Sequence, residues 1–206
     1  MDAAGRDTGR VEAFSDGVYA IAITLLVLDL KVPPASADLA AFLRGQWPTY
    51  AAFLTSFLVL GIMWLNHHRL FRLIRRVDHG LLLWNGALLL VTVTLPFGTS
   101  LLSEHLRHPG GHLAAEIYSG LMLACAACYN GLWLHLASRR RKERLLVAAC
   151  GHPEVQAIHR AYLVGLGLYA AAFLLAFVNP LLALLVQAGL AAYFALPPKS
   201  LELPAA

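Results

Sequence analysis

Six apolar stretches, most of them close to 20 residues long, dominate this sequence. A helix needs about 20 predominantly apolar residues to cross the hydrocarbon of a bilayer, because it rises only about 1.5 Å per residue. We therefore predict an all-α integral membrane protein with a single six-helix transmembrane domain over residues 1–206. The expected spans are residues 11–30, 48–66, 81–97, 113–136, 161–178 and 181–196.

Composition excludes most other classes of protein. Of the residues, 59% are hydrophobic and only 14% are charged, far from the balance of an ordinary soluble domain. The three cysteines are an odd number, which argues against a disulfide framework. Cys125 and Cys128 form a CxxC pair in an apolar run, which we interpret as packing residues because zinc needs a second pair. No HExxH, GxSxG or Gly-rich phosphate loop occurs, so we predict no enzyme, cofactor or metal site.

The N-terminal stretch also has some features of a cleaved signal peptide. Arg6 and Arg10 precede the apolar run, and Ala35-Ser36-Ala37 resembles a cleavage site. Asp16 and Asp29 flank the apolar core, however, and a pair of prolines precedes the candidate site. We therefore favour a retained span.

Prolines and glycines mark the expected ends of the helices. Pro33-Pro34 is expected to end the first span, Pro96 with Gly98 the third, and Pro197-Pro198 the sixth. Asn179-Pro180 is a tight turn between the last two spans. A short surface helix is expected over residues 38–44, with Asp38 as its N-cap.

The basic residues predict the orientation in the membrane. Thirteen of the sixteen Lys and Arg residues fall on one side when the six spans are threaded through a bilayer, and only Lys31, Arg44 and Arg107 fall on the other. Cytoplasmic loops carry the excess of Lys and Arg. Both termini are therefore expected in the cytoplasm.

The first half of the first span carries polar residues that are expensive at membrane depth. Arg10, Ser15 and Asp16 precede the apolar run, and the cytoplasmic end of the second span carries His67 and His68. We predict a network of arginine, carboxylate and imidazole that fixes the rotation of the first span. The alternative is that Arg10 and Asp16 lie in headgroups and water.

The second half of the first span carries a stripe of branched apolar side chains. Ile21, Leu25 and Leu28 share one helical face, with Thr24 beside them. In an oligomer, this face would form a hydrophobic constriction, although any apolar span yields such stripes. Asp29 would lie at the external mouth, where it either attracts cations, pairs with Lys31 or caps the helix end.

Histidines are abundant, and none is singled out as a ligand. His105, His108 and His112 have spacings that permit a zinc site, but Pro109-Gly110-Gly111 interrupts them. Solvated loop histidines are the simpler interpretation.

The stretch Arg10-Val-Glu-Ala-Phe14-Ser15-Asp16, followed by Gly-Val-Tyr-Ala-Ile-Ala-Ile-Thr-Leu-Leu-Val-Leu, resembles the signature of bacterial relatives of the endo-lysosomal potassium channel, transmembrane protein 175. The order of six spans and Trp64-Leu-Asn-His-His after the second span are also similar. The resemblance covers essentially the whole chain, and it is sharpest in the first span.

The resemblance implies a potassium-permeable cation channel that lacks a TVGYG filter, which is also absent from this sequence. Bacterial members are homotetramers whose first span lines the central pore. The residues that match the constriction are Ile21, Leu25 and Leu28, and Thr24 matches the residue implicated in selectivity. The structural network is expected to include Arg10, Phe14, Ser15, Asp16, and His67 or His68.

The expected surroundings follow from this resemblance. The partners are three further copies of the chain, membrane lipid, and K⁺ with other monovalent cations, without nucleic acid. The location is the bacterial inner membrane. Two other interpretations stay open: a proton- or cation-coupled secondary transporter that uses Asp16 and the histidines, and a non-conducting accessory protein that docks through its basic loops.

Overall fold

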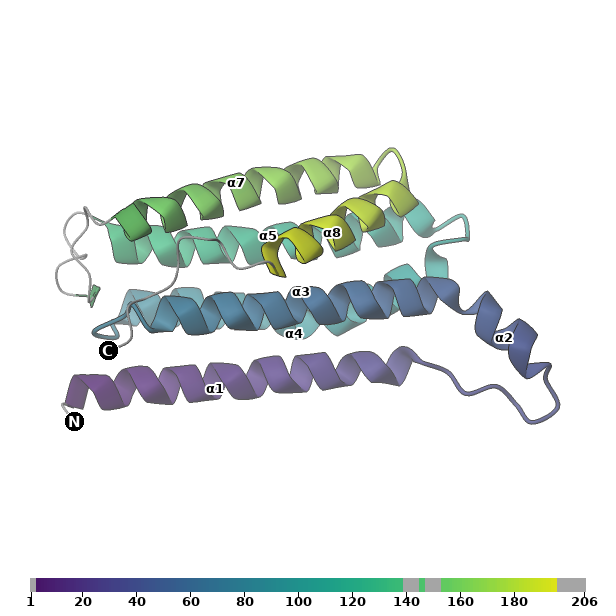
Figure 1. Cartoon of the computed structure of the whole chain (residues 1–206), viewed down its shortest axis with the longest axis horizontal. Helices are drawn as coiled ribbons and strands as arrows, with labels where there is room; N and C mark the ends of the chain where they lie inside the picture. The colour runs from purple at the N-terminus through teal and green to yellow at the C-terminus, as the bar shows by residue number, and fades with distance from the viewer. Residues whose placement is uncertain (1–2, 139–144, 147–152, 196–206) are drawn as a thin grey trace.

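The structure is a computed structural model and describes residues 3–138, 145–146 and 153–195. Its long helices run side by side (Figure 1). They are α1 (Ala3–Leu25), α3 (Trp47–Phe71), α4 (His79–His105), α5 (Gly111–Ala137), α7 (Pro153–Ala176) and α8 (Pro180–Ala195). The 3-10 helix η1 (Leu26–Asp29) and the short helix α2 (Leu39–Gly45) lie between α1 and α3. The predicted all-helical class is confirmed for these residues.

Five of the helices in the described part of the chain are long and apolar enough to cross a membrane. They are α1 with η1, α3, α4, α5 and α7. The sixth, α8, has only 16 residues and a length of about 24 Å, less than the roughly 30 Å of hydrocarbon. A complete sixth span therefore stays a prediction.

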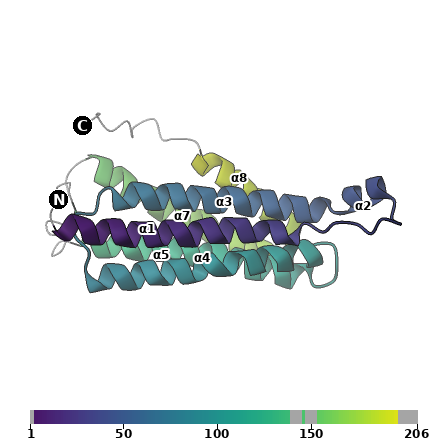
Figure 2. The same cartoon turned by 90° about the horizontal axis from the view of Figure 1, so that it is seen from below.

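The bundle has two sides. α1 packs mainly against α3 and α4, whereas α5 packs on α4 and α7. Viewed along the shortest axis of the molecule, α1 and α7 lie at opposite edges (Figure 1). In the turned view, α3 and α4 lie on either side of α1 (Figure 2). α8 lies between α3 and α7 and stops partway along them (Figure 1).

The predicted end of the third span at Pro96 is wrong, because α4 continues through Pro96 to His105. Leu95, Thr99 and Leu102 are all fully buried, so the packing face continues across the proline. Packing on both sides offsets the lost backbone hydrogen bond, as is common in membrane helices. The loop expected between the third and fourth spans is consequently shorter, and His105 and His112 belong to helices.

The other predicted helix ends agree more closely with the structure. The Asp38 carboxylate caps α2 by accepting from the backbone N–H groups of Ala40 (2.9 Å) and Ala41 (3.1 Å), as predicted. α1 and α7 begin earlier than expected, at Ala3 and Pro153. Three features of the sequence lie outside the described residues: the basic run 139–144, the third cysteine, Cys150, and the proline pair 197–198.

An apolar cluster closes the end of the bundle where α3 ends. It contains Leu70, Phe71, Ile74, Leu81, Leu132, Trp133, Leu136, Leu145 and Leu146. Residues 145–146 join it through a bridge between Ile74 and Leu146. The carboxylate of Asp78 caps α4 at the N–H of Leu81 (2.8 Å) and pairs with His135 of α5 (2.9 Å). These contacts connect three segments at one end.

The turn between α4 and α5 generates a stability prediction. A Cβ on Gly111 would lie 2.9 Å from the His105 carbonyl oxygen and 3.0 Å from that of Leu106, and both are backbone atoms that cannot rotate away. Gly111→Ala should therefore lower the unfolding temperature. The matched control is Gly86→Ala on α4, where a Cβ meets no atom within 4 Å and alanine favours the helix. Equal unfolding temperatures for the two variants in detergent would contradict this prediction.

Candidate ion pathway

α1 has one buried face and one exposed face. Ser15, Tyr19, Ala22 and Leu26 recur every three or four residues and are at most 1% exposed. That spacing defines a single stripe along a helix, and it packs against α3 and α4. The rotation of α1 about its axis is therefore fixed by its own subunit.

The buried stripe begins with a polar chain that crosses three helices. The amide nitrogen of Asn85 on α4 donates to Ser15 Oγ (3.0 Å), and Nε2 of His67 on α3 donates to Asn85 Oδ1 (2.9 Å). Ser15 Oγ in turn donates to the Val11 carbonyl (2.8 Å). His67 is fully buried, stacked on Phe71, and its Nδ1 has no hydrogen-bond partner among the described residues. We define the Ser15–Asn85–His67 chain as the polar lock of α1.

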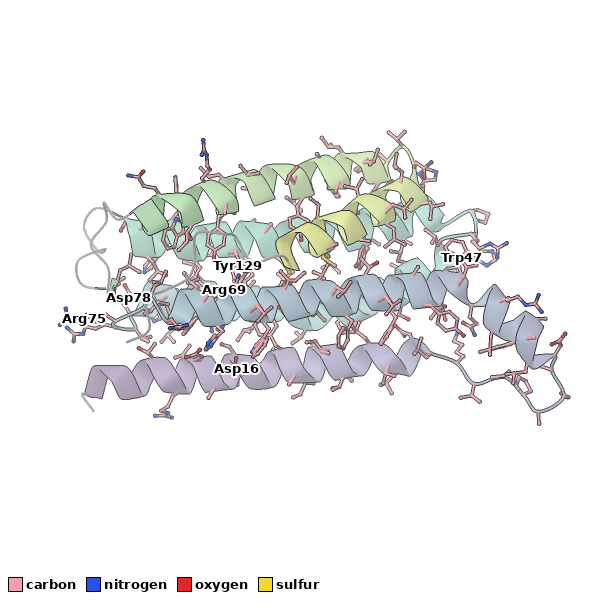
Figure 3. The ribbon with its side chains drawn as sticks, viewed as in Figure 1. Asp16, Trp47, Arg69, Arg75, Asp78 and Tyr129 are labelled. Atoms are coloured by element: carbon pink, nitrogen blue, oxygen red, sulfur yellow. The ribbon has the colours of Figure 1, made fainter. Side chains whose placement is uncertain are left out.

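The remaining polar residues of α1 form contacts at its edge. Asp16 accepts a hydrogen bond from Nε1 of Trp64 (2.9 Å), on the side of α1 that faces α3 (Figure 3). Glu12 pairs with Nδ1 of His68 (2.7 Å). Both pairs are partly exposed, unlike the polar lock.

The structure therefore distributes the sequence-predicted network over separate contacts. Ser15 and His67 meet through Asn85, His68 meets Glu12, and Asp16 meets Trp64. Arg10 and Phe14 are exposed, and Arg10 forms no hydrogen bond or ion pair within the part of the chain that the structure describes. The expected direct contact of Arg10 and Asp16 with a histidine is not formed within one subunit.

One helical turn farther along, a tyrosine pair extends the attachment. The hydroxyl of Tyr19 lies 3.0 Å from that of Tyr129 on α5, and Tyr129 donates to the Met63 carbonyl on α3. Because that donation uses the Tyr129 proton, Tyr19 is the donor in the pair. A second hydroxyl cluster joins Ser56, Thr99 and Tyr118 in the core. These hydrogen bonds between helices fix the positions of α1, α3, α4 and α5 relative to one another.

The opposite face of α1 is apolar and uncovered. Ile21 is 60% exposed, Leu25 43% and Leu28 73%. Thr24 lies on the same side, where its hydroxyl donates to the Ile21 carbonyl (2.9 Å) and keeps its lone pairs exposed. Leu28 belongs to the tighter η1 turn, in which residues three apart lie above one another, so it stays aligned with Leu25. We define Ile21, Thr24, Leu25 and Leu28 as the outer face of α1.

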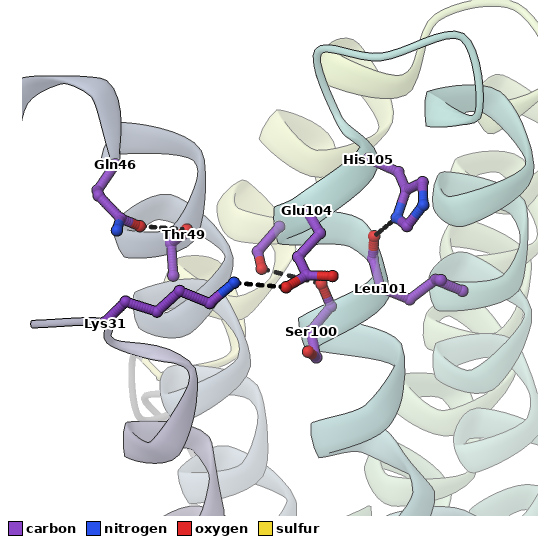
Figure 4. Close-up of polar contacts among 8 residues, drawn as sticks. Lys31, Gln46, Thr49, Ser100, Leu101, Glu104 and His105 are labelled. Atoms are coloured by element: carbon purple, nitrogen blue, oxygen red, sulfur yellow. Dashed lines mark hydrogen bonds and ion pairs between the residues drawn. The ribbon is translucent and has the colours of Figure 1, made fainter. Parts of the chain in front are cut away.

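An ion pair fixes the chain just beyond this face. Lys31 Nζ donates to Glu104 Oε1 of α4 at 2.6 Å (Figure 4). The hydrogen bond with Glu104 raises the pKa of the Lys31 ammonium. Asp29, the last residue of η1, is half-buried, and Lys31 reaches Glu104 as its ion-pair partner. Figure 4 also shows His105, whose Nδ1 bonds to the Leu101 carbonyl (3.0 Å).

Sequence reasoning missed Asn85, Trp64 and the pairing role of Glu12. The available signal for Asn85 was a lone amide in an otherwise apolar span, where an unpaired polar group is costly. The signal for Trp64 was its position four residues before His68, on the same helical face. Periodicity alone does not say which of these groups meet.

Known proteins match this chain over the same helices. The family model for the endosomal/lysosomal potassium channel TMEM175 matches residues 10–96, which include all of α3 and most of α1 and α4. A potassium channel of Chamaesiphon minutus is 48% identical over 194 residues, covering 92% of this chain and 94% of that protein. A potassium channel of Streptomyces collinus is 44% identical over 191 residues, covering 91% of each.

A solved structure has the same fold. The crystal structure of a lysosomal potassium-selective channel TMEM175 homolog from Chamaesiphon minutus superposes with a TM-score of 0.82. The sequence identity is 47%, and the match covers 92% of this chain and 97% of that one.

The polar lock generates a prediction about stability. Asn85→Leu keeps a similar volume but leaves the Ser15 hydroxyl and the His67 ring without their partner in the dry core. We expect this variant to lose about 1–3 kcal/mol of unfolding free energy. Trp64→Phe removes only the partly exposed bond to Asp16 and should cost about 1 kcal/mol or less. Denaturation of the purified proteins in detergent distinguishes them, and a wild-type midpoint for Asn85→Leu would contradict the assignment.

Proposed function

The chain belongs to the TMEM175 family, and we propose that it is a potassium-permeable cation channel that conducts K⁺ passively across a membrane. Its bacterial relatives in this family are named potassium channels, whereas the vertebrate relatives are named endosomal/lysosomal proton channels, and no enzymatic family is indicated. The observation that carries the mechanism is the outer face of α1. The polar lock turns this apolar face away from the subunit, so that only lipid or other copies of the chain are left to cover it.

We infer that four copies bring the outer face of α1 to a common axis. Rings of Ile21, Leu25 and Leu28 would then form successive apolar constrictions. Apolar constrictions gate ions by expelling water, because a K⁺ ion without its hydration shell is strongly destabilised between hydrocarbon side chains. Opening requires the rings to widen enough to hold water. The exposure of these side chains in the single subunit supports this arrangement.

Selectivity in this arrangement falls to Thr24. The sequence contains no TVGYG segment to supply rings of carbonyl oxygens. Thr24 lies beside the Ile21 ring, and its lone pairs are available to a partly dehydrated cation because its proton is donated to the Ile21 carbonyl. A hydroxyl oxygen is a suitable ligand for K⁺, whereas the neighbouring leucines offer none. Asp29 would attract cations at the outer mouth, held there by η1 and by the neighbouring Lys31–Glu104 ion pair.

The proposed location is the bacterial inner membrane, with both termini in the cytoplasm. The distribution of Lys and Arg supports this orientation, since thirteen of sixteen fall on one side of the six predicted spans. The polar lock then lies in the cytoplasmic half of α1, and the Lys31–Glu104 pair lies at the external end.

The constriction is tested at Ile21. Ile21→Asn should hydrate the narrowest ring and raise the K⁺ flux from liposomes several-fold, because a polar amide removes the dewetting barrier. Ile21→Val keeps the ring apolar and should leave the flux close to wild type. A correctly assembled Ile21→Asn protein with unchanged flux would count against a pore at this position.

Selectivity is tested at Thr24. Thr24→Val keeps the branched shape and removes the hydroxyl, so the permeability ratio of K⁺ to Na⁺ should fall toward one while conduction persists. Reversal potentials under opposed K⁺ and Na⁺ gradients measure this ratio. An unaltered reversal potential would show that the hydroxyl plays no part in selecting K⁺.

A further inference from the structure

A groove lies between α3, α5 and α7, on the side of the subunit away from α1. α8 lies between α3 and α7 but stops partway along them (Figure 1). A cavity of about 80 Å³ lies between α3, α5 and α7. Its apolar wall includes Val59, Ile62, Met122 and Leu166. We refer to it as the α3–α5–α7 groove.

Two of the polar side chains that line this groove are already paired within the protein. Asn130 donates to the carbonyls of Ala126 (2.9 Å) and Tyr162 (3.0 Å), and Tyr129 donates to the Met63 carbonyl. Most of the lining is apolar, so an apolar occupant makes more favourable contacts with it than water does. The wall of an empty cavity loses dispersion contacts, which an apolar occupant restores.

The groove lies within the membrane-spanning part of the bundle. The described span of α7 runs over Ile158–Ala176, and only 6% of its most apolar window is buried inside the subunit. The medium around α7 is therefore hydrocarbon, and acyl chains are the apolar molecules present at high concentration. The cavity has room for about two to three water-sized groups, so it would take a short stretch of one chain while the rest lies along α7.

A positive charge stands at one end of the groove. Val59, Ile62, Asn66 and Arg69 follow one another at helical spacing along α3, and the first three line the cavity. The Arg69 side chain is exposed, and its guanidinium interacts electrostatically with Tyr162 across the groove. Arg69 lies along α3 near the level of Tyr129, whereas Arg75 lies at the tip of the bundle (Figure 3).

This combination matches a lipid with a negatively charged head. Arg69 is two residues from the end of α3 at Phe71, so its long side chain reaches the depth of the phosphate groups. A guanidinium binds phosphate oxygens through two parallel hydrogen bonds. Basic sites between membrane helices commonly hold anionic headgroups for this reason.

We propose that the α3–α5–α7 groove binds an anionic phospholipid, with part of an acyl chain in the cavity and the phosphate on Arg69. The site goes beyond ion conduction, because it lies at the edge of the subunit opposite the outer face of α1 (Figure 1). Binding there requires only that the bundle is inserted in a membrane.

Native mass spectrometry of the full-length, delipidated protein with added phosphatidylglycerol tests the site. Ala161→Trp fills the groove from its exposed rim on α7, and Arg69→Gln removes the charge. Arg69→Gln should retain phosphatidylglycerol about fivefold less than wild type, the loss expected for one basic contact near the headgroups. Ala161→Trp should also retain less of the lipid, because the indole takes the space of the acyl chain. Phosphatidylcholine, with the same chains and no net charge, should be retained less than phosphatidylglycerol by wild type.

The matched controls are Ala171→Trp, an exposed alanine of α7 outside the cavity wall, and Arg75→Gln. Both should retain the lipid as wild type does, and size-exclusion chromatography confirms that each variant is folded. Equal retention in all four variants would overturn the proposal, because it would indicate annular lipid only. Loss in Arg69→Gln without loss in Ala161→Trp would also overturn it. Lipid retention only after removal of residues 197–206 would identify the chain's own tail as the occupant instead.

Discussion

The architecture depends on the need to satisfy polar groups inside a dry bundle. In hydrocarbon, no water is present to form hydrogen bonds with an unpaired amide, hydroxyl or imidazole. Buried polar side chains are therefore most stable when they pair with a group of the protein. The Ser15–Asn85–His67 chain is the clearest case, since it joins α1, α4 and α3 through bonds of 2.9–3.0 Å. Apolar packing against lipid tails cannot choose a helix rotation by itself, because lipid is as apolar as leucine. The polar lock makes that choice.

Two consequences follow from one fixed rotation. The stripe from Ser15 to Leu26 is buried, and the stripe from Ile21 to Leu28 is turned outward. The tyrosine pair Tyr19–Tyr129 holds the middle of α1, and the Lys31–Glu104 ion pair holds the chain just past its end. A helix restrained at three levels presents its apolar side chains at defined positions. In a homotetramer, those positions would determine where the pore is narrow and where a hydroxyl meets the ion.

The sequence predicts an all-helical chain with several apolar helices, five of which are long enough to cross a membrane, because apolar length is a local property. It also predicts the Asp38 cap, where the carboxylate and the N–H groups that it accepts from are neighbours in the chain. Pro96 misled the prediction because burial of Leu95, Thr99 and Leu102 by other helices offsets the broken backbone bond. The hydrogen-bond partners of Asp16, His67 and His68 could not be predicted from the sequence for a related reason. Their contacts to Trp64, Asn85 and Glu12 depend on how α1, α3 and α4 are placed beside one another.

Single-channel recording of the purified protein in planar bilayers, with K⁺ on one side and Na⁺ on the other, tests the central claim most directly. A potassium-permeable pore lined by α1 predicts discrete openings whose current reverses near the K⁺ equilibrium potential. Absence of openings, together with ion flux in liposomes at a fixed stoichiometry to a coupled ion, would contradict the channel and indicate a transporter.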